Sequence, residues 1–86
     1  MAYAIQFLPT AARELEELPA RFRAQVARRI AALADDARPA NATMLQGQHG
    51  YYRIRSGDYH VIYVIEDDVL VVLVVKVAHR REAYRR

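Results

Sequence analysis

The sequence has no cysteine, so neither disulfide bonds nor a thiolate metal site is available to it. It also lacks a long hydrophobic segment: the longest wholly apolar run, Val69 to Val75, is far shorter than the roughly 20 residues that a membrane helix needs. The first residues do not show the charged region and apolar stretch of a signal peptide. We therefore expect a cytoplasmic protein that does not enter a membrane.

Several catalytic patterns are missing as well. The histidines, His49, His60 and His79, lack the HxxxH and HExxH spacings, so we expect no metal site and no cofactor. No glycine-rich loop could cradle a nucleotide, and no serine lies in a nucleophile elbow. The carboxylates fall on predicted helix surfaces or turns without a convergent pair: Glu14, Glu16, Glu17, Asp35, Asp36, Glu66, Asp67 and Asp68.

The composition indicates one small folded domain over residues 1–86. A hydrophobic share of 53% is ample for a packed core. A chain of this size buries only about 60% of its unfolded surface, so a partner would add stability. The net charge is +3, and twelve of the thirteen basic residues are arginine, which binds phosphates in a forked geometry. The basic C-terminal end favours nucleic acid or an acidic protein segment as partner; a merely solvated surface is the alternative.

The first part of the chain predicts one strand and two helices. Residues 3–8 alternate with period two, as in a half-buried strand, and Pro9 ends them. From Thr10 the apolar residues recur at helical spacing, and Pro19 ends one helix where a second can begin. The two apolar stripes are Ala12, Leu15 and Leu18 in the first helix and Phe22, Val26, Ile30 and Leu33 in the second. These segments predict a helical hairpin whose stripes belong to the core.

A loop over residues 37–50 precedes three predicted strands, at 51–55, 58–66 and 69–78. Ser56-Gly57-Asp58 and Glu66-Asp67-Asp68 are compact hairpin connections between them. The last strand is apolar on both faces, which places it centrally in the sheet with helices on one side. Beyond it we expect a short helix or a basic tail. The order β-α-α-β-β-β predicts an α+β domain with the helical hairpin on one face of a mainly antiparallel sheet.

The candidate functional residues lie on the strands after the loop. Arg53 and Arg55 are two positions apart, so both guanidinium groups project from the same face of the sheet. The hairpin turn brings His60 of the next strand near Arg55, although the face that it occupies depends on the register. A partly buried histidine with a structural role is the alternative.

The end of the chain adds further cations and a phenol. His79, Arg80, Arg81 and Tyr84 follow the central strand, where scaffolds often present reactive groups. If Arg80 and Tyr84 fold back over the strand cations and His60, the result is a phosphate-binding pocket with an aromatic stacking surface. The alternative for such a tail is a plain electrostatic patch. The remaining tail cations expected to contact RNA are Arg81, Arg85 and Arg86.

In its motifs and their order the chain resembles the RelE/ParE superfamily, the small toxins of type II toxin–antitoxin operons. The resemblance covers nearly the whole chain. The matching segments are Leu8-Pro9-Thr10-Ala11-Ala12-Arg13, Leu45-Gln46-Gly47, Tyr52-Arg53-Ile54-Arg55, Gly57-Asp58-Tyr59, Val61-Ile62-Tyr63 and Val77-Ala78-His79-Arg80-Arg81-Glu82-Ala83-Tyr84. Each segment alone is degenerate, but their order and spacing together are specific.

The resemblance implies a function. RelE-type members are ribosome-dependent endoribonucleases that cut mRNA in the A site, by attack of a ribose 2′-OH on the adjacent phosphate. Residue by residue, the resemblance assigns the catalytic cations to Arg53, Arg55 and Arg80 and the tyrosine to Tyr84. It also implies a cognate antitoxin as partner, in a toxin–antitoxin hetero-oligomer, with a monomeric toxin when free.

His60 departs from the family, whose GDYRV pattern has arginine at this position. An imidazole with a pKa near 6.5 can move protons at neutral pH, whereas arginine stays charged and is a poor base. One interpretation makes His60 the general acid or base. The other is the loss of a phosphate clamp, with weaker activity or a changed target.

Two other functions stay open. The first is a ParE-like toxin that poisons DNA gyrase without nuclease chemistry, although ParE-type chains usually lack the cation and tyrosine set found here. The second is a degenerate member that is kept only to bind an antitoxin or to act as an operator co-repressor.

Overall fold

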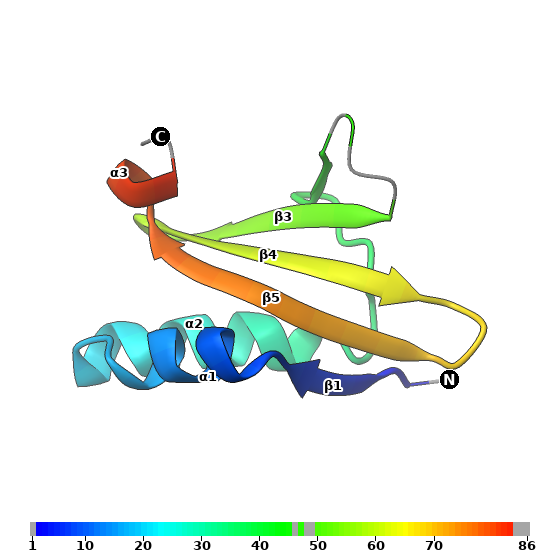
Figure 1. Ribbon diagram of the computed structural model, residues 1–86, viewed down its shortest axis with the longest axis horizontal. Helices are drawn as coiled ribbons and strands as arrows, with labels where there is room; N and C mark the ends of the chain where they lie inside the picture. The colour runs from blue at the N-terminus through cyan, green and yellow to red at the C-terminus, as the bar shows by residue number, and fades with distance from the viewer. Residues whose placement is uncertain (1, 46, 48–49, 84–86) are drawn as a thin grey trace.

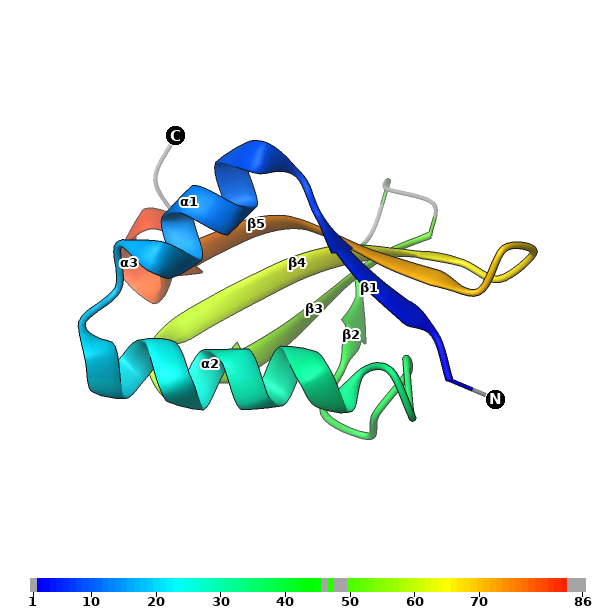
Figure 2. The same ribbon diagram turned by 90° about the horizontal axis from the view of Figure 1, so that it is seen from below.

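The computed structural model describes residues 2–45, 47 and 50–83, which form a sheet with helices on both of its faces (Figures 1 and 2). The strand order is β1-β5-β4-β3-β2. The strands are β1 (Ala4–Phe7), β2 (Thr43–Met44), β3 (Tyr51–Ser56), β4 (Tyr59–Glu66) and β5 (Val71–His79), and the helices are α1 (Pro9–Glu16), α2 (Ala20–Ala32) and α3 (Arg80–Ala83). Helices α1 and α2 cover one face, and α3 lies over the end of the opposite face (Figure 1).

The core lies between α1 and α2 and the face of the sheet that they cover. Pro9 opens α1, where its missing N–H costs no hydrogen bond, and Pro19 caps the start of α2. The helices contribute Ala11, Val26 and Ile30, all buried. The sheet contributes a second set of buried apolar side chains: Ile54, Val61, Tyr63, Ile65, Val72, Val74 and Val77. Burying both apolar faces together leaves the other face of the sheet open to the solvent and to α3.

The pairing of the strands determines which side chains share that open face. Strands β3 and β4 are antiparallel and joined by a tight hairpin, whereas β1 runs parallel to β5. Tyr63 of β4 faces the helices, where its hydroxyl donates to the carbonyl oxygen of Ala37 at 2.9 Å. Since side chains alternate along a strand, His60, Ile62 and Val64 face the other way. The open face therefore carries the even-numbered residues of β4.

Glu14 protects the exposed edge of β5. Strand β1 pairs with only the first part of β5, from Val71 to Val74, so the rest of that edge has no neighbouring strand among the residues that the structure describes. The Glu14 carboxylate accepts the backbone N–H of Val77 at 2.9 Å and the ammonium of Lys76 at 3.3 Å. A side chain of α1 thus replaces the missing strand, which holds the end of β5 in place.

Replacing Glu14 with alanine should therefore lower the free energy of unfolding. The loss should be about 1 to 3 kcal/mol, because a backbone N–H would lose a charged acceptor. Urea unfolding of the two proteins measures it. Glu16→Ala, an exposed position on the same helix, is the matched control and should change stability little. Equal stability of the Glu14 and Glu16 variants would show that the contact to Val77 is not stabilising.

The fold confirms the predicted α+β class, with two differences in detail. The predicted loop of residues 37–50 contains the short strand β2, which pairs with Tyr52 and Arg53 of β3. Strand β5 begins at Val71 instead of Val69, because the residues between Glu66 and Val71 form the turn of the hairpin. Of the two forms expected after β5, the structure shows the short helix, α3, over its described part. No helix within the described residues is long and apolar enough to cross a membrane.

Candidate functional site

The open face of the sheet brings together Arg53, Arg55 and His60. Arg55 of β3 lies directly opposite His60 of β4, and Arg53 lies opposite Ile62, two positions further along. The guanidinium groups and the imidazole therefore project from the same face, as expected for the arginines and left open by the sequence for His60. Arg55 is exposed, whereas His60 is buried, with only 2% of its surface exposed.

The hairpin turn between β3 and β4 positions Arg80. Gly57 occupies the first central position with φ +60°, a backbone conformation that a side chain would strain and that two-residue hairpins require there. The next residue, Asp58, accepts the backbone N–H of Arg80 through its carbonyl oxygen at 2.6 Å. Its carboxylate lies 3.9 Å from the Arg80 guanidinium. The turn thus holds the start of α3, and with it Arg80, beside the arginine strand.

These elements enclose a small pocket of about 100 Å³ on the open face. Arg55, Gly57, His60 and Arg80 line it, so two guanidinium groups and one imidazole converge on the same space. Arg53 lies outside the lining but close enough to act electrostatically on His60. A group the size of a phosphate that enters the pocket would meet charged donors on two sides.

Burial of His60 lowers the pKa of its imidazole below the ordinary value of 6.5, and the positive charges of Arg53, Arg55 and Arg80 lower the pKa further. At neutral pH the ring is therefore mainly neutral. A neutral imidazole can accept a proton, whereas the guanidinium groups around it can only stabilise negative charge.

Within the described residues, Arg53 and Arg55 are not neutralised by carboxylates in the way that other cations of the chain are. Arg38 forms a salt bridge with Asp67 at 2.8 Å, and Lys76 pairs with Glu14. Neither Arg53 nor Arg55 forms a salt bridge with any residue in the described part of the chain. The open face consequently keeps its positive charge available for an anionic ligand.

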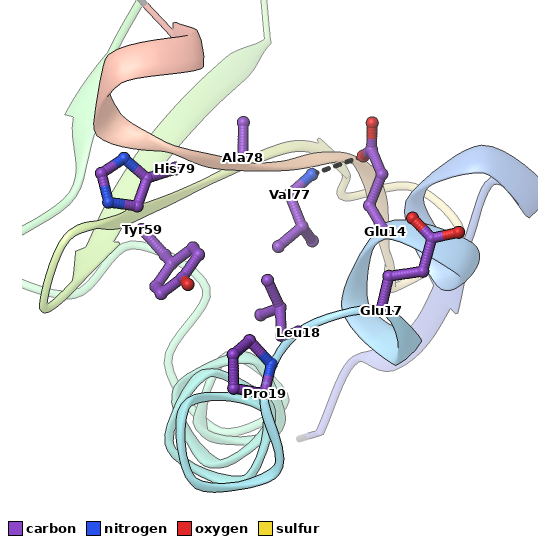
Figure 3. A pocket seen from close by; sticks show the side chains of 8 residues that line it. All are labelled: Glu14, Glu17, Leu18, Pro19, Tyr59, Val77, Ala78 and His79. Carbon is purple, nitrogen blue, oxygen red and sulfur yellow. Dashed lines mark hydrogen bonds between the residues drawn. The ribbon is translucent and has the colours of Figure 1, made fainter.

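A larger pocket, of about 430 Å³, lies at the same end of the sheet but on its helix side (Figure 3). Its lining is Glu14, Glu17, Leu18, Pro19, Tyr59, Val77, Ala78 and His79. Glu14 is held by the backbone of Val77, and Glu17 adds a second carboxylate (Figure 3). Two carboxylates repel a polyanion, so the arginine face is the better candidate for nucleic acid even though its pocket is smaller.

The remaining predicted residues divide into two groups. Arg81 is exposed on α3, next to Arg80. Tyr84, Arg85 and Arg86 lie outside the described residues. Across residues 2–45, 47 and 50–83, no cluster of three His, Asp or Glu side chains could hold a metal ion.

Sequence reasoning missed two acidic residues. The sequence predicts Asp58 as a turn residue and does not predict its contact with Arg80. That contact forms because the hairpin turn packs against the end of β5. Glu14 was predicted to face outward, but it is bound to β5. Asp58 and Arg80 are 22 positions apart in the sequence, and Glu14 and Val77 are 63 apart. No local sequence pattern links residues at such separations.

The fold and the site together define a small α+β protein with a cationic sheet face suited to an anionic ligand. A sequence model of the ParE toxin of type II toxin–antitoxin systems matches residues 5–84. Toxin RelG of Mycobacterium tuberculosis is 31% identical to the chain over the full length of both. The chain belongs to the ParE toxin family of type II toxin–antitoxin systems, within the RelE/ParE superfamily.

Solved structures agree with this assignment. The toxin–antitoxin complex RelBE2 of M. tuberculosis contains a chain that is 30% identical, with a TM-score of 0.79 over 93% of this chain and 100% of that one. The isolated RelE toxin of E. coli is 26% identical, with a TM-score of 0.81 over 95% of each chain. The intact E. coli RelBE complex gives 30% identity and a TM-score of 0.79, over 91% of this chain and 96% of the other. The resemblance and the fold predicted from the sequence are confirmed.

Proposed function

We propose that this toxin is an endoribonuclease that cuts mRNA in the ribosomal A site and so inhibits translation. The observation that carries the proposal is the convergence of Arg55 and Arg80 on a pocket that also contains the neutral imidazole of His60. An RNA phosphate supplies the negative charge that these groups fit. The RelE-like relatives and the predicted cation set support the same chemistry.

The proposed reaction is a transfer within the RNA itself. The ribose 2′-OH attacks the adjacent phosphorus, the bond from phosphorus to the 5′-oxygen breaks, and the products are a 2′,3′-cyclic phosphate and a 5′-OH. One proton must leave the 2′-OH and one must reach the 5′-oxygen. His60, neutral at neutral pH, is the proposed acceptor of the first proton.

The arginines have an electrostatic role in this mechanism. Negative charge develops on the phosphate oxygens as the fifth bond forms, and guanidinium groups already in position stabilise it without reorganisation. Arg55 and Arg80 line the pocket, and Arg53 adds charge from the same face. Tyr84 remains part of the proposal as the aromatic group that stacks on a base or supplies a proton. Arg81, Arg85 and Arg86 are proposed to contact the RNA backbone.

Mapping of 5′ ends tests the function directly. A defined mRNA is incubated with the toxin in a translating bacterial extract, and in parallel as free RNA without ribosomes. Cuts at ribosome-occupied codons, absent from the free RNA, are expected. Equal cutting of free RNA would show that cleavage does not require the ribosome. Intact mRNA in the extract, together with growth arrest in cells that express the same toxin, would refute the nuclease.

Inhibition of DNA gyrase is the second candidate, and one observation favours it: the sequence model that matches the chain describes ParE toxins. This function needs a protein-binding surface and no catalytic pocket. DNA breaks that depend on gyrase, together with a DNA-damage response, would identify it. The pocket around His60 has no role in that function, so substitutions there would leave such toxicity unchanged.

The proposed protein partner is a cognate antitoxin. The similar complexes from M. tuberculosis and E. coli pair a toxin with its antitoxin. An extended acidic or amphipathic antitoxin segment that covers the arginine face would neutralise its charge. Added apolar contacts would also offset the small core, since binding to the folded state alone raises stability.

Binding of RNA should weaken steeply as salt rises. For single strands the logarithm of the binding constant falls by about 0.7 per log unit of salt for each phosphate contact. Arg55→Ala should reduce the slope by about that amount, since Arg55 lines the pocket. Fluorescence anisotropy with a labelled RNA oligonucleotide over a salt series measures the slope. Arg28→Ala, an exposed position on α2, should keep the wild-type slope. A flat salt response of the wild type would indicate a protein target instead.

A further inference from the structure

Arg80 lies between two pockets, so the direction of its side chain matters for the proposed reaction. The small pocket with His60 is on one side of Arg80. The other side borders a pocket of about 350 Å³, lined by Asp58, His79, Arg80 and Arg81. A guanidinium group that turned into this larger space would approach the Asp58 carboxylate, now 3.9 Å away, and would leave the phosphate beside His60. The proposed reaction therefore requires that the backbone at Arg80 be held in one position.

Helix α3 cannot hold this position by itself. Its described part, Arg80–Ala83, is a single turn, whereas an isolated helix needs roughly 12 residues or more to be stable in water. The backbone N–H groups of a first helical turn also have no partner within the helix. A side chain just before the helix can accept one of these N–H groups, which stabilises the start of the helix. The position of Arg80 therefore depends on contacts from outside α3.

His79 supplies a contact of this kind. It is the last residue of β5, and its Nδ1 accepts the backbone N–H of Arg81 at 3.2 Å. Arg81 is the second residue of α3, one of the two positions whose N–H an N-cap side chain binds. The carbonyl oxygen of Asp58 accepts the N–H of Arg80, the first residue, at 2.6 Å. Two hydrogen bonds from different parts of the chain thus occupy the first two N–H groups of α3.

The ring of His79 is held on the helix side of the sheet, away from the small pocket. His79 lies directly opposite Tyr59 of β4, and the two rings meet edge to face with centroids 5.3 Å apart (Figure 3). Tyr59 packs in turn on Phe22 of α2, with 5.6 Å between the ring centroids. The side chain of His79 is not among those that line the small pocket. His79 therefore connects the packed helix layer to the start of α3.

We propose that His79 is a positioning residue for the nuclease: its hydrogen bond to Arg81 fixes the start of α3 and so keeps the Arg80 guanidinium beside His60. This role rests on the proposed nuclease function. His79 acts through Arg80 and does not touch the RNA, so it is not a catalytic residue. Without the hydrogen bond, Arg80 should spend part of its time turned away from the phosphate, and the cleavage rate should fall by that fraction.

Three substitutions separate the hydrogen bond from the ring contact. His79→Phe keeps a ring against Tyr59 but has no acceptor, and His79→Ala has neither. His79→Asn loses the ring but places an amide oxygen, a preferred N-cap acceptor, near the position of Nδ1. Cleavage of mRNA in a translating extract should be slower by roughly three- to tenfold in the Phe and Ala variants, the range expected for one lost N-cap hydrogen bond. His79→Asn should restore cleavage to nearly the wild-type rate.

Two further measurements connect the effect to Arg80. In an Arg80→Ala background, assayed at higher toxin concentration, His79→Phe should cause no further loss, because the side chain that it positions is absent. The N–H of Arg81 should exchange with deuterium faster in His79→Phe than in wild type or His79→Asn, a readout that needs no nuclease activity. Thermal midpoints show whether each variant is folded, and His79→Ala, which introduces no larger group, repeats the test if His79→Phe does not fold.

The outcomes distinguish this role from the nuclease itself. Wild-type cleavage in His79→Phe and His79→Ala, or failure of His79→Asn to restore cleavage, overturns the positioning role and leaves the nuclease intact. Unchanged exchange of the Arg81 N–H in His79→Phe overturns it as well. An equal loss in the Arg80→Ala background would show that His79 acts independently of Arg80, which also overturns it. Intact mRNA with the wild-type toxin overturns the proposed function, and the role of His79 with it.

Discussion

Replacing Arg80 with alanine is expected to lower the rate of mRNA cleavage by roughly 100-fold or more and to abolish growth arrest. Removing one donor to a developing oxyanion has an effect of this order. Arg80 lines the pocket beside His60, and the hydrogen bond from its backbone to Asp58 sets its position. Arg80→Lys should recover part of the activity, because lysine keeps the charge but loses the forked geometry. The measurement is the cleavage rate in a translating extract, with growth arrest in cells beside it.

A folding defect should not account for the loss of cleavage activity in Arg80→Ala. The Arg80 side chain is 64% exposed, and its pairing with Asp58 spans 3.9 Å at the surface, where an ion pair contributes about 0 to 1 kcal/mol. The thermal midpoint of Arg80→Ala should therefore stay close to that of wild type. Arg28→Ala controls for the loss of one exposed arginine and should remain toxic. Wild-type toxicity in Arg80→Ala would remove Arg80 from the site.

Replacement of His60 is expected to have the second large effect, a loss of roughly 100-fold or more in cleavage rate, the usual contribution of a general acid or base. Glutamine places an amide nitrogen near the position of Nε2, and asparagine places one near Nδ1. Amides can reproduce a hydrogen bond but do not titrate. If His60 transfers a proton, neither variant should be active, whereas a structural hydrogen bond should be rescued by one of them.

The dependence on pH separates the two roles further. A base whose pKa lies below 6.5 makes the wild-type rate rise with pH through that lowered value and level off by neutral pH. His60→Arg, which restores the residue of the family pattern, should remove this limb because arginine does not titrate in that range. A wild-type pH profile in His60→Gln would assign His60 to structure.

Stability should follow pH in the same direction. Because the folded state holds His60 with a lowered pKa, the unfolded state binds the proton more readily. The contribution to the free energy of unfolding is complete above pH 6.5 and is lost as the pH falls from there through the folded pKa. Urea midpoints over this range should decline less in His60→Gln than in wild type. Parallel declines would show that another group is responsible.

Periodicity predicted most of the fold because each helix and strand is defined by its own residues. The helical stripe from Phe22 to Leu33 and the alternation of β4 were read correctly. The ends of elements were less well predicted. Val69 is apolar and favours a strand, but the chain must reverse between β4 and β5, so the strand starts later. The two residues of β2 carry no pattern, and only the edge of β3 makes them a strand.

The candidate site was likewise predicted in part from the sequence and in part decided by the tertiary structure. The alternation of Arg53 and Arg55 determined that they share a face, and the sequence alone supplied the excess of arginine and the departure at His60. The pattern of residues within one strand does not determine which residues lie opposite each other on neighbouring strands. The register of β3 and β4 decided that His60 lies opposite Arg55 and beneath the cations that lower its pKa.

What the sequence by itself determined is the set of elements, the sign of the charge and the family, because each depends on residues that are close together or on their order. Only the tertiary structure decided that Arg80 shares one pocket with His60 and a second pocket with Asp58. These contacts join segments that are distant in the chain, and they form when the burial of the apolar face packs the sheet against α1 and α2. The gain in free energy from that burial fixes the register, and the register in turn places the charges.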